Sequence, residues 1–241
     1  MSKWIAIGDI HGRDTWKPIV NSEIDNVDRI IFVGDYFDSF HIPMQTQISN
    51  FLDILELKRK YPDRVVLLIG NHDYHYMRSV KQTYSGFNSV YSLQIESDCI
   101  LPAIRDGLLE MCHIEGDYLF SHAGFTKTWL DSIAEIDPEV EPIDTAINYL
   151  FFYKPNLFRF QSSYKLTLSD SYGDNHWQGP LWVRPASLKA ARIDGWKQVV
   201  GHTEKYSIES SDGLYFIDAL DNGYYLHKDD ITDEPVVKKI R

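Results

Sequence analysis

The stretch V-V-L-L-I-G-N-H-D, residues 65–73, sets an apolar run directly before the pair Asn71-His72. A short apolar run that ends at a glycine is typical of a buried strand. Two earlier runs have the same design: W-I-A-I-G-D-I-H-G covers residues 4–12, and I-I-F-V-G-D-Y-F-D covers residues 30–38. We therefore predict three strands that deliver carboxylate, imidazole and amide groups to one edge of a sheet.

Two later segments repeat this pattern. Y-L-F-S-H-A-G, residues 118–124, brings His122, and Q-V-V-G-H-T, residues 198–203, brings His202. Five strand ends are thus expected to converge, and Asp, His and Asn side chains gathered at one sheet edge indicate a metal centre. The competing interpretation, in which each is only a cap or a satisfied core polar residue, must account for five coincidences.

Length and composition predict one soluble α/β domain over residues 1–241. No apolar run approaches the roughly 20 residues that cross a bilayer, so no membrane partner is expected. The net charge of −11 opposes nonspecific nucleic-acid binding. The N-terminus lacks a signal-peptide pattern, and Cys99 and Cys112 have no metal or redox spacing. We expect reduced thiols and a cytoplasmic location.

The order of apolar patterns predicts a sheet that begins parallel and a chain that ends in antiparallel strands. Helices are expected at 13–21, 43–60, 100–109 and 126–136. Alternating segments at 214–218 and 224–227, joined by Asp221-Asn222-Gly223, predict a hairpin, and a last strand is expected at 236–240.

The region from about residue 140 to residue 182 departs from this alternation because it is rich in aromatic residues and has no βα rhythm. We interpret it as a cap inserted over the site. Alternatively, its aromatic side chains pack a small core within the insertion, as buried aromatic residues usually do.

The residue types suit two divalent cations. Asp9 and His11, two positions apart after a strand, can share one ion. A carboxylate has two oxygens and can bridge two ions, which suits Asp35. A mixed set of nitrogen and oxygen ligands is completed by Asn71, His122 and His202. Such a set favours Mn, with Fe or Zn as alternatives.

Paired cations clamp a phosphoryl group and lower the pKa of a bridging water, so that hydroxide is available near neutral pH. That chemistry is hydrolytic. His72 is adjacent to a ligand without being needed as one, so it can donate a proton to the leaving oxygen, with Asp38 orienting it. Asp73 is expected to support the loop rather than to bind metal.

The ordered motifs Gly-Asp-x-His-Gly, Gly-Asp-x-x-Asp, Gly-Asn-His-Asp, His-Ala-Gly and Gly-His, between residues 8 and 203, resemble the calcineurin-like metallophosphoesterase superfamily. The resemblance implies a four-layer α/β/β/α sandwich with two central mixed sheets and a dinuclear centre at their C-terminal edge. It implies a first metal site of Asp9, His11 and Asp35, and a second of Asp35, Asn71, His122 and His202. His72 would be the catalytic acid.

Within that superfamily the pattern is closest to phosphoprotein phosphatase-like and diadenosine tetraphosphatase-like members from bacteria and phages. Thr203 follows Gly201-His202, unlike the diesterases that end in Gly-His-x-His. Ser39 stands where phosphoprotein phosphatases usually place an arginine. Arg184 resembles the later substrate-phosphate arginine of bacterial members, Arg13 is a weaker second candidate, and an ordinary surface arginine is the alternative reading of Arg184.

Three functions follow from this. Hydrolysis of phosphomonoesters, on a phosphoprotein or a small molecule, leads. Hydrolysis of dinucleoside polyphosphates or other nucleotide phosphodiester or anhydride bonds is the alternative, and a noncatalytic metal-binding scaffold comes last. The remaining histidines are expected to be surface or packing residues, although His75 and His176 could border the pocket: His41, His75, His113, His176 and His227.

Overall fold

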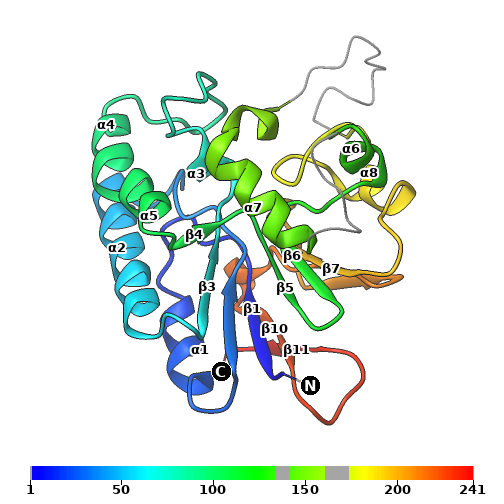
Figure 1. Ribbon diagram of the computed structural model, residues 1–241. Helices are drawn as coiled ribbons and strands as arrows, with labels where there is room; N and C mark the ends of the chain where they lie inside the picture. The colour runs from blue at the N-terminus through cyan, green and yellow to red at the C-terminus, as the bar shows by residue number, and fades with distance from the viewer. Residues whose placement is uncertain (1, 134–141, 161–173, 241) are drawn as a thin grey trace.

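The computed structural model describes residues 2–133, 142–160 and 174–240, and its strands form two mixed sheets (Figure 1). Sheet A has six strands in the order β11-β10-β1-β2-β3-β4. They are β1 (Trp4–Ile7), β2 (Arg29–Phe32), β3 (Val65–Leu68), β4 (Leu109–Glu110), β10 (Tyr224–Lys228) and β11 (Val236–Lys239). Strands β1 to β4 are parallel, whereas β10 and β11 pair antiparallel at one edge.

Sheet B has five strands in the order β5-β6-β7-β9-β8. They are β5 (Cys112–Glu115), β6 (Tyr118–Ser121), β7 (Lys197–Val200), β8 (Glu209–Ser211) and β9 (Leu214–Phe216). The three central strands are parallel, and the edge strands β5 and β8 are antiparallel to their neighbours. Both sheets are therefore mixed, as the family resemblance implied.

The helical segments lie mainly on the outer faces of the two sheets (Figure 1). The α-helices are α1 (Trp16–Glu23), α2 (Met44–Lys60), α3 (Asn71–Tyr74), α4 (Ser92–Gln94), α5 (Leu101–Arg105), α6 (Lys127–Asp131), α7 (Ile143–Tyr153) and α8 (Pro185–Ala190). A π-helix, η1 (Ile95–Ile100), joins α4 to α5, and 3₁₀ helices occupy η2 (Pro155–Phe158) and η4 (Leu220–Asn222). No helix among these described segments is both long and apolar enough to span a bilayer.

Successive side chains of β1 point to opposite faces of sheet A, as strand geometry requires. Ile5 and Ile7 belong to the large core that α1 and α2 cover. Trp4 and Ala6 belong to the core between the two sheets, where the Trp4 ring meets the rings of Tyr118 and Phe120 edge to face, with centroids 5.0 Å away in each pair. The two sheets are therefore stacked directly on each other.

Helices also cover the outer face of sheet B. Leu188 of α8 packs with Val200 and Phe216 of the sheet, and α7 packs against β5. The amide of Asn148 on α7 bonds the backbone of β5, since its oxygen accepts from the Cys112 N–H and its nitrogen donates to the Cys112 carbonyl. The layer order is thus helices, sheet A, sheet B, helices, which confirms the predicted fold class.

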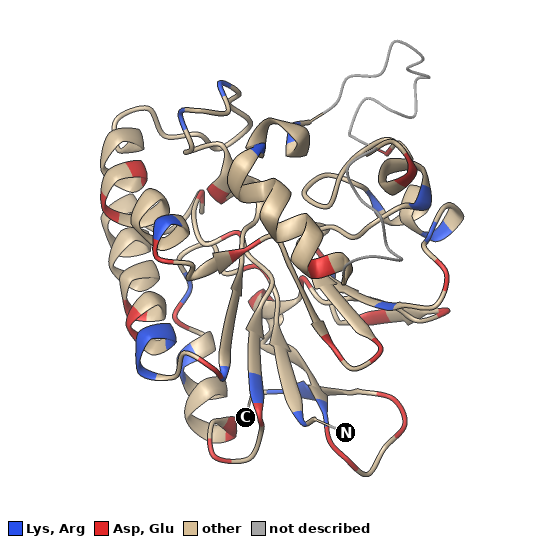
Figure 2. Ribbon diagram, in the orientation of Figure 1, with Lys and Arg blue, Asp and Glu red and all other residues tan. Residues whose placement is uncertain are grey.

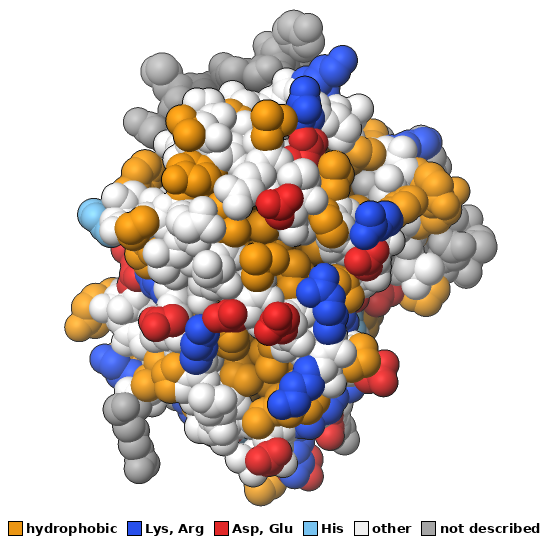
Figure 3. Space-filling view, turned by 90° about the vertical axis from the view of Figure 1, so that its left-hand side faces the viewer, with side chains coloured by type: hydrophobic (Ala, Val, Ile, Leu, Met, Phe, Trp, Pro, Cys, Tyr) orange, Lys and Arg blue, Asp and Glu red, His pale blue; other side chains and the backbone are white. Residues whose placement is uncertain are grey.

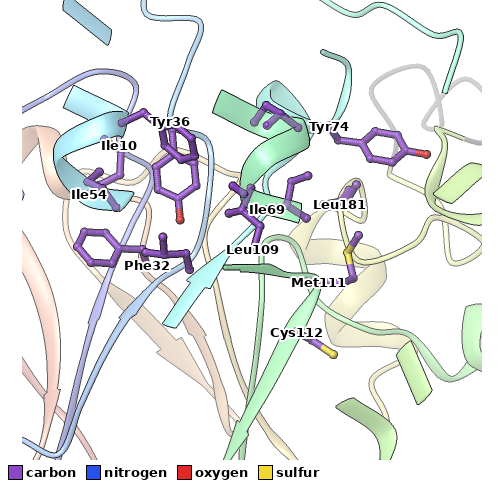
Figure 4. Close-up of a cluster of buried hydrophobic side chains, with 14 of the residues drawn as sticks. Ile10, Phe32, Tyr36, Ile54, Ile69, Tyr74, Leu109, Met111, Cys112 and Leu181 are labelled. Atoms are coloured by element: carbon purple, nitrogen blue, oxygen red, sulfur yellow. The ribbon is translucent and has the colours of Figure 1, made fainter. Parts of the chain in front are cut away.

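Figure 4 shows the core beneath the strand ends of sheet A. Phe32 of β2 lies beside Ile54 of α2, and Ile69, just past β3, lies near Leu109 of β4. All four side chains are buried. The turns that follow β1, β2 and β3 therefore start from a rigid, close-packed base.

Acidic positions are spread over many of the described helices, strands and loops (Figure 2). Figure 3 shows the layer of α2, α4 and α5 from outside, where hydrophobic side chains are interspersed with charged ones. Large exposed hydrophobic residues on these helices are Leu52, Leu93 and Leu101. Scattered apolar side chains of this kind are ordinary for a protein surface.

The predicted hairpin at 214–227 is wrong. Strand β9 belongs to sheet B and β10 to sheet A, and the chain between them crosses from one sheet to the other. Ile217 and Ala219 are buried between the sheets, so their burial directs the chain across rather than back. Gly223, at φ 76°, ends the intervening 3₁₀ helix η4 instead of closing a two-residue turn.

The helix predicted at 100–109 is also displaced. It begins earlier, as α4 and η1, and ends at Arg105, because Gly107 takes a left-handed conformation and Leu109 pairs into sheet A. The helices predicted at 13–21 and 43–60 are present as α1 and α2. For the helix predicted at 126–136, α6 accounts for Lys127–Asp131, and residues 134–136 lie outside the described part.

Only part of the predicted insertion lies within the described residues. Helix α7 buries Ile147, Leu150 and Phe151 in the main core, so this segment is not a separate unit. Tyr149, Phe152 and Tyr153 on the same helix are exposed. Residues 140–141 and 161–173 of the insertion lie outside the description, and its role as a cap stays a prediction.

Candidate metal centre

The five predicted strand ends meet at one place between the two sheets. Asp9 and His11 follow β1, Asp35 follows β2, Asn71 begins α3 after β3, His122 follows β6 and His202 follows β7. Ligand atoms of Asp9, His11 and Asp35 lie within 4.8 Å of one another, and so do those of Asp35, His122 and His202. The structure therefore brings together all the residues predicted as metal ligands, with Asn71 placed by the contacts described below.

The turns that carry these side chains are unusually tight. His11, Asp35, Asp38 and His202 have positive φ values of 43°, 52°, 68° and 65°. Non-glycine residues adopt this region rarely, and such strain is concentrated at functional sites. A side chain at Gly70 would collide with the Asp35 carboxylate. The glycine of the Gly-Asn-His motif is thus required by the close approach of two strand ends.

The first group contains Asp9, His11 and Asp35. The His11 ring donates its Nδ1–H to the Phe37 carbonyl at 2.6 Å, which leaves Nε2 as an acceptor 3.8 Å from Asp35 Oδ2. The Asp9 carboxylate accepts the His202 backbone N–H at 3.0 Å. Backbone contacts thus fix the tautomer of His11 and the position of Asp9, as outer partners of metal ligands do.

The second group contains Asp35, Asn71, His122 and His202. The His122 ring donates Nδ1–H to the Val33 carbonyl at 2.9 Å, so its Nε2 is an acceptor. That atom lies 2.8 Å from Asn71 Oδ1, 3.2 Å from His202 Nδ1 and 3.4 Å from Asp35 Oδ2. His202 Nδ1 is also 2.9 Å from Asn71 Oδ1. Asp35 Oδ2 is shared by both groups.

The electrostatics of these groups fit bound cations. Burial, followed by the Asp218 and Asp35 carboxylates, raises the pKa of Asp9 well above its usual value. Burial lowers the pKa of His11 and His122 and, together with His122, that of His202. The three imidazoles are therefore neutral at pH 7, and acceptor atoms face one another at short distances. A cation between them removes that repulsion, so the residues present fit a metal centre.

His72 differs from these three histidines. Its Nδ1–H donates to Asp38 Oδ2 at 2.9 Å, and its backbone N–H donates to Asp35 Oδ1 at 2.9 Å. Burial alone would lower the pKa of His72, but the Asp35 and Asp38 carboxylates outweigh burial and raise it to about 9. The ring is therefore protonated at neutral pH and stands beside the ligand cluster.

Three further side chains belong to the site. Sequence reasoning placed His75 only as a possible neighbour of the pocket and gave Tyr76 and Asp218 no place in it. His75 Nε2 lies 2.7 Å from Asp38 Oδ2, and the Tyr76 hydroxyl donates to Asp38 Oδ1. Asp218, just past β9, has a pKa raised to about 7 by burial and then by Asp35. The spacing of His72 in α3 and His75 directly after it was an available signal, since residues three apart share a helix face.

Asp73 supports the loop, as expected from the sequence. Its carboxylate accepts the Tyr36 N–H and the Gly70 N–H, each at 2.8 Å, and thereby ties the turn after β2 to the turn after β3.

The two predicted phosphate-binding arginines are placed differently. Arg184 donates through one guanidinium nitrogen to the His202 carbonyl and to Thr203 Oγ1, both at 3.1 Å, so it lies against the second group. Arg13 lies near Asp9 but pairs with Asp221 through both Nε and its terminal nitrogen. The guanidinium group of Arg13 is thus already paired with a carboxylate at the surface.

Comparison with known proteins gives a family match and a relative. The family model described as calcineurin-like phosphoesterase matches residues 3–213. The chain is 35% identical over 86 residues to the serine/threonine-protein phosphatase 4 catalytic subunit of Eremothecium gossypii, a match that covers 34% of this chain and 25% of that protein.

Solved structures share the fold. The cold-active protein-tyrosine phosphatase of the psychrophile Shewanella sp. superposes with a TM-score of 0.58 at 18% identity, covering 94% of this chain and 75% of that one. A metallophosphoesterase from Sphaerobacter thermophilus superposes with a TM-score of 0.51 at 15% identity, covering 100% of this chain and 88% of that one.

Proposed function

The chain belongs to the calcineurin-like phosphoesterase family, and from this premise we propose that it is a metal-dependent hydrolase of phosphomonoesters. One observation carries the proposal: a cluster of neutral imidazoles and carboxylates suited to cations stands beside one protonated imidazole, His72. Phosphoester hydrolysis needs both, because charge develops on the phosphoryl oxygens while the leaving oxygen needs a proton.

We place the first cation among Asp9, His11 and Asp35, and the second among Asp35, Asn71, His122 and His202. Asp35 Oδ2 faces His11 Nε2 and His122 Nε2, which supports a bridging role. Mn is proposed for both sites because the donor set mixes nitrogen with oxygen, with Fe and Zn as alternatives. When bound, such a pair supplies positive charge for the phosphoryl oxygens and a hydroxide nucleophile near neutral pH.

His72 is proposed as the general acid. Its Nδ1 is held by Asp38, so the proton available for transfer is the one on Nε2. The buried Asp38 carboxylate orients the ring, and the Asp35 and Asp38 carboxylates together raise its pKa. Transfer of the Nε2 proton to the leaving oxygen then lets an alcohol depart in place of an alkoxide.

The monoester preference rests on the second group. Thr203 follows His202 and accepts a hydrogen bond from Arg184, so this position holds a guanidinium beside the ligands in place of a further imidazole. We propose that Arg184 also binds a nonbridging phosphate oxygen, since a guanidinium recognises phosphate through paired donors. Arg13 is proposed in the same role, but it must first leave Asp221.

We propose that the insertion at about 140–182 limits which substrates reach the centre. The Trp182 ring lies with its centroid 6.3 Å from that of His202, and its Nε1–H donates to the Phe158 carbonyl at 2.9 Å. Trp182, at the end of the insertion, is thus tied to Phe158 in its middle, at the edge of the site. A cytoplasmic location is also proposed and is consistent with two buried, unpaired cysteines.

A substrate panel tests the proposal. The protein, loaded with Mn, is assayed on p-nitrophenyl phosphate, bis-p-nitrophenyl phosphate, phosphopeptides and dinucleoside polyphosphates. We expect turnover of the monoesters and loss of activity with EDTA. Preferential cleavage of a dinucleoside polyphosphate would favour the nucleotide hydrolase instead, and activity that survives complete metal removal would reject the metal centre.

A further inference from the structure

We propose that His75 is a positioning residue that extends the His72–Asp38 pair into a chain of three. This inference rests on the proposed function, because it assigns His75 a role in orienting the general acid. His75 is four positions from the nearest predicted metal ligand, Asn71, and its contacts are to Asp38 rather than to the ligand cluster.

The Asp38 carboxylate is fully enclosed and is contacted from three directions. Oδ2 lies between His72 Nδ1 at 2.9 Å and His75 Nε2 at 2.7 Å, and Oδ1 accepts the Tyr76 hydroxyl. Asp38 also has a φ of 68°, and a side chain at Gly86 would collide with its Cβ. The carboxylate is therefore closely confined, and His75 contacts the same oxygen as the proposed acid, with the two imidazole centroids 5.7 Å apart.

His75 is itself held in one orientation. Its Nδ1 accepts the Tyr84 backbone N–H at 3.4 Å, so in the neutral ring the proton is on Nε2, the nitrogen beside Asp38. The Tyr84 ring stacks on the imidazole at 5.9 Å with planes 8° apart, and the Phe87 ring meets its edge at 5.2 Å. The His75 side chain is fully buried.

The contact between His75 and Asp38 is electrostatic more than directional, since Nε2–H does not point straight at the oxygen. Its effect is to stop Asp38 from turning away from His72. Without the contact from His75, Oδ2 of Asp38 could rotate away from His72. The Nε2–H of His72 would then no longer be oriented toward the leaving oxygen. The predicted defect is thus in proton transfer and not in substrate binding.

Two variants of His75 test whether its N–H donor or only the volume of its side chain is needed. His75→Leu keeps an apolar side chain and removes the N–H, whereas His75→Gln keeps an N–H near the position of Nε2. With an alkyl phosphate, we expect His75→Leu to lower kcat about 10-fold or more with KM unchanged, and with p-nitrophenyl phosphate about threefold or less. His75→Gln should recover the alkyl phosphate rate to within about threefold of the unaltered protein.

Controls distinguish positioning from loss of structure. His227→Gln is the matched control, because His227 is also a buried histidine beside a carboxylate, that of Glu23, and lies at the opposite end of sheet A. This variant should leave the rate of hydrolysis of both substrates unchanged. Equal losses on both substrates in His75→Leu, or no recovery in His75→Gln, would overturn the proposal. So would metal analysis showing a third ion per chain that His75→Leu loses, because Asp38, His72 and His75 would then be a metal site.

The same assays on His72→Asn keep this inference separate from the proposed function. If His72→Asn selectively loses activity on the alkyl phosphate and His75→Leu does not, the positioning role of His75 is rejected. The proposal that His72 is the general acid is then retained. If His72→Asn shows no selective loss, the proposed general acid fails and the role of His75 fails with it.

Discussion

The ligand histidines His11 and His122 and the neighbouring His72 behave in opposite ways at this site. His11 and His122 donate Nδ1–H to backbone carbonyls and turn a bare Nε2 toward acidic oxygens. His72 donates Nδ1–H to a buried carboxylate, Asp38. The rings of His11 and His72 have centroids only 5.3 Å apart, yet burial lowers the pKa of His11 while carboxylates raise that of His72 to about 9.

The difference teaches that the partner of Nδ1 decides the role of His11, His122 and His72. A carbonyl partner fixes the tautomer without adding charge, so the ring stays neutral and can bind a cation. A carboxylate partner stabilises the charged ring, so it holds a proton. The following predictions run from the largest expected effect to the smallest. They test whether the metal ligands and His72 are functionally distinct.

Asp35→Asn should have the largest effect, because Asp35 is the residue shared by both ligand groups. We expect activity to fall further than in Asn71→Ala, which removes one ligand of one ion, and we expect both ions to be weakened. The measurements are metal content per chain and turnover with Mn. A variant that keeps two ions and near-normal turnover would show that Asp35 does not bridge.

His72→Asn should leave both ions bound, because His72 is not one of the predicted metal ligands. Activity on an alkyl phosphate should fall about 10² to 10⁴-fold, the usual size of general acid catalysis, and less on p-nitrophenyl phosphate, whose leaving group hardly needs a proton. Metal analysis accompanies the rates. Loss of an ion would move His72 into the ligand set and erase the distinction between the groups.

Arg184→Gln should raise KM for phosphomonoesters by about 10- to 100-fold, corresponding to the roughly 1.5 to 3 kcal/mol of a hydrogen bond to a charged group. Its guanidinium lies against the carbonyl of His202, so phosphate bound at the second group is within its neighbourhood. Metal content is the control. If the variant loses metal with KM unchanged, Arg184 supports His202 and does not bind substrate.

Arg13→Gln should have the smallest effect, within about threefold on KM, because its guanidinium pairs with Asp221 and a surface ion pair contributes little. The matched variant Asp221→Asn releases Arg13 and should lower KM slightly if the arginine can reach phosphate. A large rise in KM for Arg13→Gln would contradict the assignment of Arg184 as the main phosphate ligand.

The strand ends could be predicted from the sequence because each is a local pattern: an apolar run followed at once by Asp, His or Asn. Parallel strands then bring such residues to a common edge without further information. Asp9, His11, Asp35, Asn71 and the two later histidines were all found in this way, and the order of the motifs gave the family. The stacked sheets followed from the family.

What only the tertiary structure decided is which distant residues meet. His75 was expected to be a surface or packing residue that could border the pocket, but its partner was not foreseen. It faces Asp38, 37 positions away, because the loop that carries Tyr84 and Phe87 folds over it. The chain crosses from β9 to β10 because Ile217 is buried between the sheets. Helix α7 belongs to the main core because Phe151 is buried there. Periodicity reports that a side chain is apolar or polar, but not which partner satisfies it, because those contacts join residues far apart in the chain.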